Sequence, residues 1–308
     1  MFRRIRYILE MIRFSHTLFA LPFALLAAVM AWSRNAHQTP PVHWRWTELA
    51  GIICCMVAAR SAAMAFNRIV DVRIDAENPR TQNRHLPAGL LSRGSVIAFA
   101  AVASAAFVAS TLLFLPNRLP LYLALPVLAL LLGYSYAKRF TVLAHFWLGL
   151  ALMLAPVSAW IAIRGQFVLA NAADLLPALI LGAAVLLWVA GFDIIYACQD
   201  VDFDRRQGLS SVPARWGVAR ALHIAALCHA GMVALLALLP MAYNRLADNG
   251  FGWLYWAGWA AVAGLLVHEH RLVRPDDLTR VNRAFFNMNI VVSVGLFLVG
   301  AADLALMH

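Results

Sequence analysis

Charged residues are scarce in this sequence. Only 13% of the 308 residues are charged, whereas 63% are hydrophobic and the mean hydropathy is +0.73. A soluble domain of this length has about a quarter charged residues, so this composition excludes an ordinary soluble domain. Apolar stretches of about 20 residues, long enough for a helix to cross a bilayer, recur along the chain, and the alternating pattern of β-barrel strands is absent. The sequence therefore predicts an all-α integral membrane protein.

Cysteine is also rare, and histidine shows no metal-binding pattern. The four cysteines are Cys54, Cys55, Cys198 and Cys228. They lie in or beside apolar stretches without the spacing of metal ligands, so we expect reduced thiols that pack as small hydrophobic side chains. The ten histidines include no pair with zinc-protease spacing. We interpret His268, Glu269 and His270 as a solvated charge cluster at a membrane edge.

The apolar stretches predict nine transmembrane helices in a single domain of residues 1–308. The expected spans are residues 14–33, 48–67, 95–115, 120–137, 143–163, 174–197, 220–241, 251–268 and 285–306. Residues 1–13 are basic and amphipathic and lack a cleavage pattern, so they predict an interfacial helix and not a signal peptide. Most of the 25 lysines and arginines lie at the N-terminus and after the even-numbered spans, which predicts that these parts face the cytoplasm. Attraction to anionic lipid accounts for the net charge of +10, so no nucleic-acid partner is expected.

Two predicted cytoplasmic segments, 68–94 and 198–219, follow an apolar span and carry carboxylates four residues apart. In "FNRIVDVRIDAENPRTQNRHLPAG", which begins at Phe66, the regular positions are Asn67, Asp71 and Asp75. In "GFDIIYACQDVDFDRRQG", which begins at Gly191, they are Tyr196, Asp200 and Asp204. The equivalent placement of the two segments suggests two related halves, as in many membrane proteins with internal repeats.

The spacing of these carboxylates has a chemical interpretation. Residues four apart share one face of a helix, and two such faces opposed across a cavity would bring four carboxylates together. Such a cluster is costly unless cations neutralise it, and Mg²⁺ takes carboxylate oxygens together with substrate phosphates. Basic residues predicted on the same cytoplasmic side, near the acidic segments or in "GYSYAKRFT", suit a diphosphate; they include Arg80, Arg84, Lys138 and Arg139. Asp193 lies deeper, inside the span 174–197, where an ionisable group either has a function or pairs with an arginine.

The motifs resemble those of a known family. "NRIVDVRIDAENPRTQNRHLPAG" and "DIIYACQDVDFDRRQG" are similar to the two aspartate-rich motifs of the UbiA superfamily of intramembrane prenyltransferases. "YSYAKRFT" and "MIRFSHTLFALPFALLA" resemble further elements of that family, and the nearest group is 4-hydroxybenzoate polyprenyltransferase-like. The resemblance implies nine transmembrane helices around a central cavity capped by the cytoplasmic segments. It also implies transfer of a polyprenyl group from polyprenyl diphosphate to an aromatic acid in quinone biosynthesis.

The resemblance further implies roles for individual residues. Magnesium would be held on the diphosphate by Asp71, Asp75, Asp200 and Asp204, with Asn67 orienting it. Donors to the departing diphosphate would be Lys138, Arg84 and Arg80. The allylic cation would face Tyr134 and Tyr196, because aromatic rings attract cations. Asp193 would help to activate the ring of the aromatic acceptor. The carboxylate of the acceptor would be bound by Arg13 and Arg139, because guanidinium groups bind carboxylates in a bidentate manner.

Two alternatives remain open. "SHTLFALPFAL" and "NPRTQNRHLPAG" also resemble prenyltransferases that modify a dihydroxynaphthoate in menaquinone biosynthesis. A membrane transporter is the alternative of another class, because intramembrane acids and half-repeats also suit ion coupling. The acidic pairs lie at one predicted membrane face and not at the midplane, which favours the transferase. The family resemblance suggests a bacterial inner membrane with the active site facing the cytoplasm.

Overall fold

The computed structural model describes residues 2–11, 19–33, 42, 44–245, 247, 250–275, 278 and 281–306. Every extended regular element among these residues is a helix, so the all-α prediction is confirmed. The chain forms two compact units, which are described separately below. Unit 1 comprises Met1–Thr17 and Thr47–Ala137, and unit 2 comprises Leu18–Trp46 and Lys138–His308.

In their described parts, the nine predicted stretches all contain a helix, but not all of these helices are long and apolar enough to span a membrane. Within the described residues a helix lies in each of the nine predicted stretches, but only seven are long and apolar enough to cross a bilayer. The described part of helix α2, Leu21–Ser33, has 13 residues. Helix α12, Trp253–Leu272, has 20 residues, but its tryptophans and the His268–His270 segment lower its hydropathy. The predicted count of nine transmembrane helices is therefore not confirmed.

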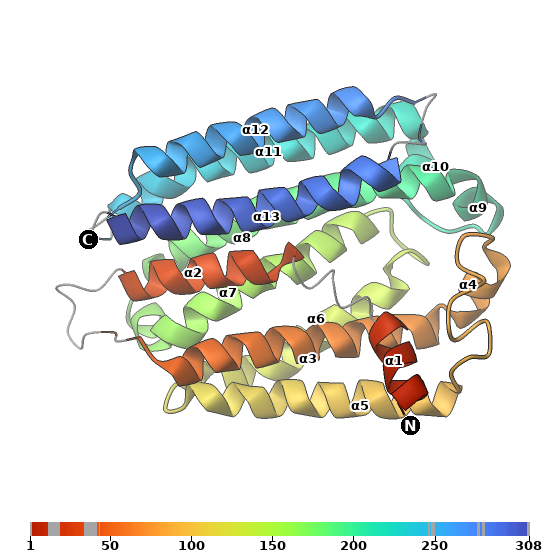
Figure 1. Cartoon of the computed structure of the whole chain (residues 1–308), viewed down its shortest axis with the longest axis horizontal. Coiled ribbons are helices and arrows are strands. Elements are labelled where there is room, and N and C mark those ends of the chain that lie inside the picture. The colour runs from red at the N-terminus through yellow and green to blue at the C-terminus, as the bar shows by residue number, and fades with distance from the viewer. Residues whose placement is uncertain are drawn as a thin grey trace. The chain divides into compact units, whose positions relative to one another are not determined.

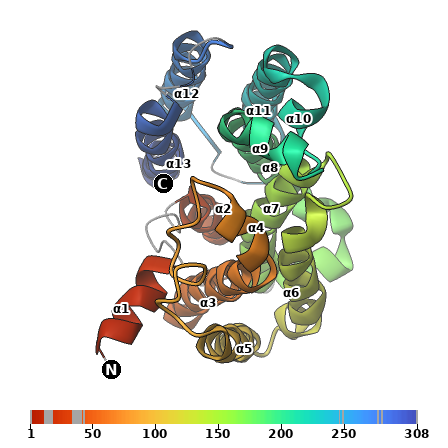
Figure 2. The same ribbon diagram turned by 90° about the vertical axis from the view of Figure 1, so that its right-hand side faces the viewer.

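Unit 1 contains three long helices and two short ones. Its elements are α1 (Phe2–Met11), α3 (Trp46–Val70), α4 (Val72–Glu77), α5 (Arg93–Ser110), the 3₁₀ turn η2 (Thr111–Phe114) and α6 (Leu119–Ala137). Helices α3, α5 and α6 lie side by side (Figure 1 and Figure 2) and meet around Ala58, Phe107 and Ala124. The predicted N-terminal helix is present as α1, and it packs through Met11 against Ala65 of α3.

Helix α1 is also tied to the loop that follows α4. The Glu10 carboxylate lies 3.2 Å from Nε2 of His85 and accepts a 2.7 Å hydrogen bond from Nε of Arg6. The Arg6 guanidinium, and after it His85, lowers the pKa of Glu10 below its usual value. Because Arg6 and Glu10 are exposed, solvent screens these contacts, and the apolar packing of Met11 carries most of the attachment.

Unit 2 contains the remaining helices. They are α2 (Leu21–Ser33), α7 (Ala144–Ala170), η3 (Ala172–Leu175), α8 (Leu176–Ala197), η4 (Cys198–Asp200), α9 (Val201–Arg206), α10 (Val212–Trp216), α11 (Val218–Asn244), α12 (Trp253–Leu272) and α13 (Val281–Leu306). Helix α8 packs between α7 and α11, and α9 and α10 lie where α8 ends and α11 begins (Figure 1).

Two glycines fix the close approach of α8 to its neighbours. A Cβ atom on Gly149 of α7 would collide with the backbone carbonyl of Leu186 in α8, and one on Gly191 of α8 would collide with the ring of His229 in α11. Membrane helices lack a hydrophobic drive to associate within lipid, so small residues that allow close backbone packing are the usual solution. Helix α8 is accordingly the most buried of the seven spanning helices.

A buried ion pair corrects the predicted end of the fifth span. The sequence places Arg164 just beyond the span 143–163, but α7 continues to Ala170 and Arg164 is completely buried. Its Nε and Nη2 atoms donate to the two carboxylate oxygens of Asp174 at 3.0 and 2.8 Å, and the Trp160 indole also donates to Asp174 at 3.0 Å. Removing one partner of such a pair costs about 3–5 kcal/mol, because the other charge stays buried.

The interpretation of residues 268–270 as a solvated cluster is wrong for two of the three residues. His268 is exposed, but Glu269 is only 2% exposed, and Nε2 of His270 lies 2.9 Å from Nδ1 of His229 in α11. Because Nε2 of His229 lies 3.2 Å from the carbonyl oxygen of Trp188, that nitrogen carries the proton and Nδ1 accepts from His270. Helix α12 extends to Leu272, which carries this segment against α11.

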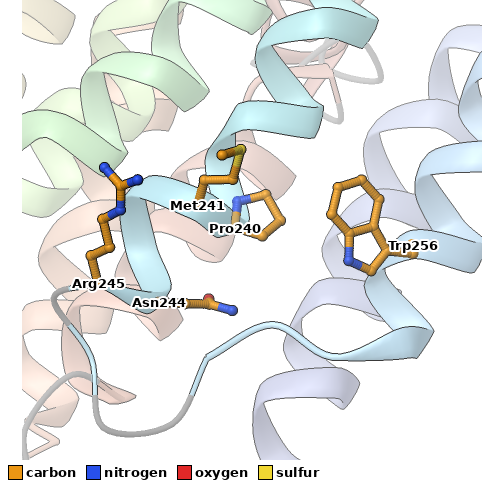
Figure 3. A pocket seen from close by; sticks show the side chains of 5 residues that line it. All are labelled: Pro240, Met241, Asn244, Arg245 and Trp256. Atoms are coloured by element: carbon orange, nitrogen blue, oxygen red, sulfur yellow. The ribbon is translucent and has the colours of Figure 1, made fainter.

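Proline 240 shapes the contact between α11 and α12 near the end of α11. Since proline has no N–H, the carbonyl of Leu236 loses its helical partner, and the Tyr255 hydroxyl donates to it at 2.7 Å. A hollow of about 380 Å³ lies nearby, as Figure 3 shows. It is lined by Pro240, Met241, Asn244, Arg245 and Trp256. None of the predicted site residues lines this hollow, so it is not a candidate for the predicted chemistry.

Candidate active site

The first acidic segment continues the helical hydrogen-bonding pattern of α3 into α4. The N–H of Asp71 donates to the carbonyl of Asn67 at 2.9 Å, and the N–H of Asp75 donates to that of Asp71 at 2.7 Å. The backbone therefore keeps its four-residue repeat across the junction, and the three side chains share one face. The amide of Asn67 donates to the Asp71 carboxylate at 2.7 Å, so Asn67 orients Asp71 directly.

Asp75 is a buried carboxylate held by two arginines. It is 5% exposed, and its oxygens accept from Nη1 of Arg84 at 2.6 Å and from Nη1 of Arg68 at 3.3 Å. The sequence singled out Arg84 as a diphosphate ligand but gave no role to Arg68. A carboxylate offers about four lone-pair positions, so two guanidinium contacts leave capacity for a cation.

The loop after α4 returns Arg84 to the acidic face. The hydroxyl of Thr81 donates to the carbonyl of Asp75 at 3.0 Å, and the N–H of Arg84 donates to the carbonyl of Thr81 at 2.9 Å. Arg80 lies between them on the exposed side of this turn, where its backbone N–H donates to the side chain of Asn78. Of the two predicted donors in this loop, Arg84 contacts a predicted metal ligand and Arg80 is exposed.

The second acidic segment, in unit 2, buries both of its predicted metal ligands. Helix α8 ends at Ala197, and the short elements η4 and α9 carry Asp200 and Asp204, which are 6% and 2% exposed. The hydroxyl of Ser211 donates to Oδ2 of Asp204 at 2.8 Å, and Nζ of Lys138 lies 3.9 Å from the same oxygen. Lys138, the only lysine of the chain, thus lies beside a predicted metal ligand of the second segment.

Asp193 has a partner that the sequence did not reveal. Its Oδ2 atom lies 2.6 Å from Nδ1 of His145, which is completely buried at the start of α7. The backbone N–H of Val212 donates to Nε2 of His145 at 3.3 Å. In the sequence, the one indication of a role for His145 is that it is an ionisable residue at the edge of the predicted span 143–163. The two residues are 48 positions apart in the sequence, so no local pattern indicates that they pair.

Residues 210–212 form hydrogen bonds with Lys138, Asp204 and His145. The N–H of Ser210 donates to the carbonyl of Lys138 at 2.7 Å, the Ser211 hydroxyl binds Asp204, and the N–H of Val212 binds His145. Ser211 is also the N-cap of α10, because its hydroxyl accepts from the N–H of Ala214. Three consecutive residues thus fix the surroundings of both a predicted metal ligand and Asp193.

The remaining predicted residues are more dispersed. Tyr134 is half-buried, and Tyr196 packs against the buried cluster formed by α8, α10 and α11. Arg139 is exposed, and Arg13 lies outside the described residues. Unit 1 contains Asn67, Asp71, Asp75, Arg80, Arg84 and Tyr134. Unit 2 contains Lys138, Arg139, Asp193, Tyr196, Asp200 and Asp204.

The donor chemistry of both segments fits magnesium that arrives with a phosphate ligand. In the described part of the chain, no three His, Cys, Asp or Glu side chains are grouped closely enough to hold a metal ion by themselves. Magnesium usually takes only one or two carboxylates and completes its shell with water and substrate phosphates. The aspartates would supply that partial shell, and the neighbouring cationic side chains would contact the phosphate.

Comparison with known proteins identifies the family. Residues 15–291 match the UbiA prenyltransferase family, and the chain belongs to that family. It is 32% identical over 257 residues to a 4-hydroxybenzoate octaprenyltransferase of Vibrio atlanticus, covering 81% of this chain and 84% of the relative. It is 30% identical over 235 residues to the enzyme of that name from Nitrosospira multiformis, covering 76% of each. The prediction of a membrane-embedded prenyltransferase is confirmed.

Solved structures show the same fold. A UbiA homologue from Aeropyrum pernix K1 superimposes with a TM-score of 0.79 at 33% identity, covering 94% of this chain and 97% of the other. A UbiA homologue from Archaeoglobus fulgidus, whose structure was determined with DMAPP and Mg²⁺, has a TM-score of 0.65 at 17% identity. The latter match covers 97% of this chain and 99% of the other and demonstrates likeness of fold.

Proposed function

We propose that this enzyme transfers a polyprenyl group from polyprenyl diphosphate to 4-hydroxybenzoate in ubiquinone biosynthesis. The observation that carries the proposal is the pairing of buried carboxylates with cations in both acidic segments, Asp75 with Arg84 and Asp204 with Lys138. Relatives that share about a third of the sequence bear the name 4-hydroxybenzoate octaprenyltransferase, which supports this acceptor.

The two acidic segments would bind the diphosphate. The residues that would hold magnesium are Asp71, Asp75, Asp200 and Asp204. When bound, the metal neutralises the charge that develops on the diphosphate as the C–O bond breaks. Asn67 keeps Asp71 oriented, and Lys138, Arg84 and Arg80 donate hydrogen bonds to the leaving group. Fixed donors of this kind stabilise developing charge without reorganisation during the reaction.

The second part of the reaction joins the prenyl carbon to the acceptor ring. The electron pair of the C–O bond leaves with the diphosphate, and the rings of Tyr134 and Tyr196 stabilise the allylic cation that remains. Asp193 accepts the phenolic proton, and the ring carbon beside the hydroxyl forms the new C–C bond. That carbon then loses its proton to water as the ring regains aromaticity, and Asp193 returns its proton to the phenolate oxygen. Arg13 and Arg139 receive the acceptor carboxylate.

The acceptor is decided by a competition assay. Purified enzyme in lipid is incubated with radiolabelled polyprenyl diphosphate, magnesium, and equal concentrations of 4-hydroxybenzoate and a dihydroxynaphthoate. We expect the label predominantly in prenylated 4-hydroxybenzoate. The dihydroxynaphthoate, whose prenylation is a step in menaquinone biosynthesis, is the second candidate acceptor, because the "NPRTQNRHLPAG" stretch resembles prenyltransferases that modify it. Preferential labelling of the naphthoate would replace the first acceptor with the second, and the Asp204→Asn variant controls for uncatalysed transfer.

We further propose that the enzyme lies in a bacterial inner membrane with both acidic segments in the cytoplasm. The distribution of lysine and arginine supports this orientation. The test introduces one cysteine at a time into a variant in which the four native cysteines are alanine. Asn171 precedes α8 and Asp202 follows it, and both are exposed. In intact cells a membrane-impermeant maleimide should label Asn171→Cys, whereas Asp202→Cys should react only after permeabilisation; the reverse pattern contradicts the orientation.

A further inference from the structure

We propose that His145 is a positioning residue that fixes the orientation of the Asp193 carboxylate. The proposal rests on the proposed function, in which Asp193 accepts a proton from the acceptor. His145 is not among the residues that the family resemblance singled out, and it is 0% exposed, so it acts through Asp193 and not on a substrate.

The hydrogen bonds define the state of the imidazole ring. The backbone N–H of Val212 can only donate, so Nε2 of His145, 3.3 Å away, is the unprotonated nitrogen. The ring proton therefore lies on Nδ1 and points at Oδ2 of Asp193, 2.6 Å away. In this tautomer the ring donates a hydrogen bond to the Asp193 carboxylate and thereby fixes its orientation.

The surrounding packing holds this pair in place. One turn along α7 from His145, Gly149 packs against the backbone of Leu186, which lies two turns before Asp193 on α8. The close helix contact therefore sets the distance between the two side chains. On the other side, the 210–212 segment supplies the N–H that selects the tautomer while Ser211 binds Asp204.

A fixed carboxylate matters because proton transfer depends on its placement. The side chain of Asp193 is 19% exposed, whereas the ring that holds it has no exposure. Asp193 is therefore the member of the pair that a substrate can reach. Misplacing a catalytic group by about 1 Å can lower the rate roughly 100-fold even when the group is present, so loss of His145 should reduce turnover although Asp193 is retained.

Kinetics on purified enzyme in lipid nanodiscs provide the first test, with radiolabelled polyprenyl diphosphate and 4-hydroxybenzoate. We expect His145→Ala to lower kcat by about 10- to 100-fold, the usual cost of removing an outer partner of a reactive group, with little change in KM for the diphosphate. His145→Gln, whose amide offers both a donor and an acceptor, should restore part of kcat. His223→Ala is the matched control, because His223 is exposed and its Nδ1 atom lies 2.8 Å from the carbonyl oxygen of Ala219 in its own helix.

A double-mutant cycle separates positioning from a general structural role. In an Asp193→Asn background, His145→Ala should cause no further loss, because the group it positions is already disabled. A full additional loss in that background, or an unchanged kcat for His145→Ala in the wild type, would overturn the proposal.

A spectroscopic measurement tests the hydrogen bond between His145 and Asp193 independently of enzyme activity. Solid-state NMR of ¹⁵N-histidine-labelled enzyme in bilayers, with the signals of His145 assigned by comparison with His145→Gln, should show a neutral ring protonated on Nδ1. Asp193→Asn should shift the Nδ1 signal. An imidazolium, or a ring protonated on Nε2, would contradict the assignment. If the wild-type enzyme labels neither aromatic acid, the proposed function fails, and these nitrogen shifts still test the His145–Asp193 pair.

Discussion

Replacing Asp204 by asparagine is expected to lower the rate of prenyl transfer by roughly 100- to 1,000-fold. Asparagine has nearly the same shape, so it preserves the packing around a side chain that is 2% exposed and keeps an oxygen for the Ser211 hydroxyl. It removes the negative charge beside Lys138 that is proposed to bind magnesium. The measurement is the initial rate of transfer of radiolabel to 4-hydroxybenzoate at saturating magnesium.

Asp202 provides a control within the same motif. It lies two residues before Asp204, but its side chain is exposed, so Asp202→Asn should leave the rate and the yield of membrane-inserted protein unchanged. Asp71→Asn, in the first motif, should behave like Asp204→Asn. A normal rate for either Asp71→Asn or Asp204→Asn, with the protein correctly inserted, would contradict the magnesium–diphosphate proposal.

Removing divalent cations is expected to abolish turnover, and adding magnesium should restore it. The carboxylates of the acidic segments would repel an unaccompanied diphosphate, so its binding would require a cation that neutralises them. The assay compares the transfer rate of metal-stripped enzyme in EDTA with the rate after addition of excess magnesium. EDTA previously saturated with magnesium is the control for effects of the chelator on the protein. An undiminished transfer rate in excess free EDTA would contradict the proposed dependence on magnesium.

The local parts of the candidate site could be predicted from the sequence. The four-residue spacing of Asn67, Asp71 and Asp75 follows the repeat of a helix, and backbone hydrogen bonds through Asp71 keep that repeat across the junction of α3 and α4. The apolar stretches likewise gave the positions of the helices, because a bilayer requires about 20 apolar residues whatever the tertiary packing. Neither inference needed knowledge of a distant residue.

The contacts that the sequence did not predict either join residues far apart in the chain or bury charged residues that were expected to be exposed. His145 meets Asp193 across 48 residues, and no spacing rule relates positions on two different helices. Glu269 was assigned to solvent because charged residues usually lie there, but the extension of α12 buries it. Arg164 was placed in a loop for the same reason, whereas Asp174 makes its burial possible.

The ion pair of Arg164 and Asp174 has a consequence for biogenesis. The two side chains belong to consecutive elements, one within α7 and the other just before α8, only ten residues apart. A guanidinium entering lipid alone is costly, and so is a lone carboxylate. Helices α7 and α8 should therefore leave the translocon together as a hairpin, each supplying the counter-charge that the other needs.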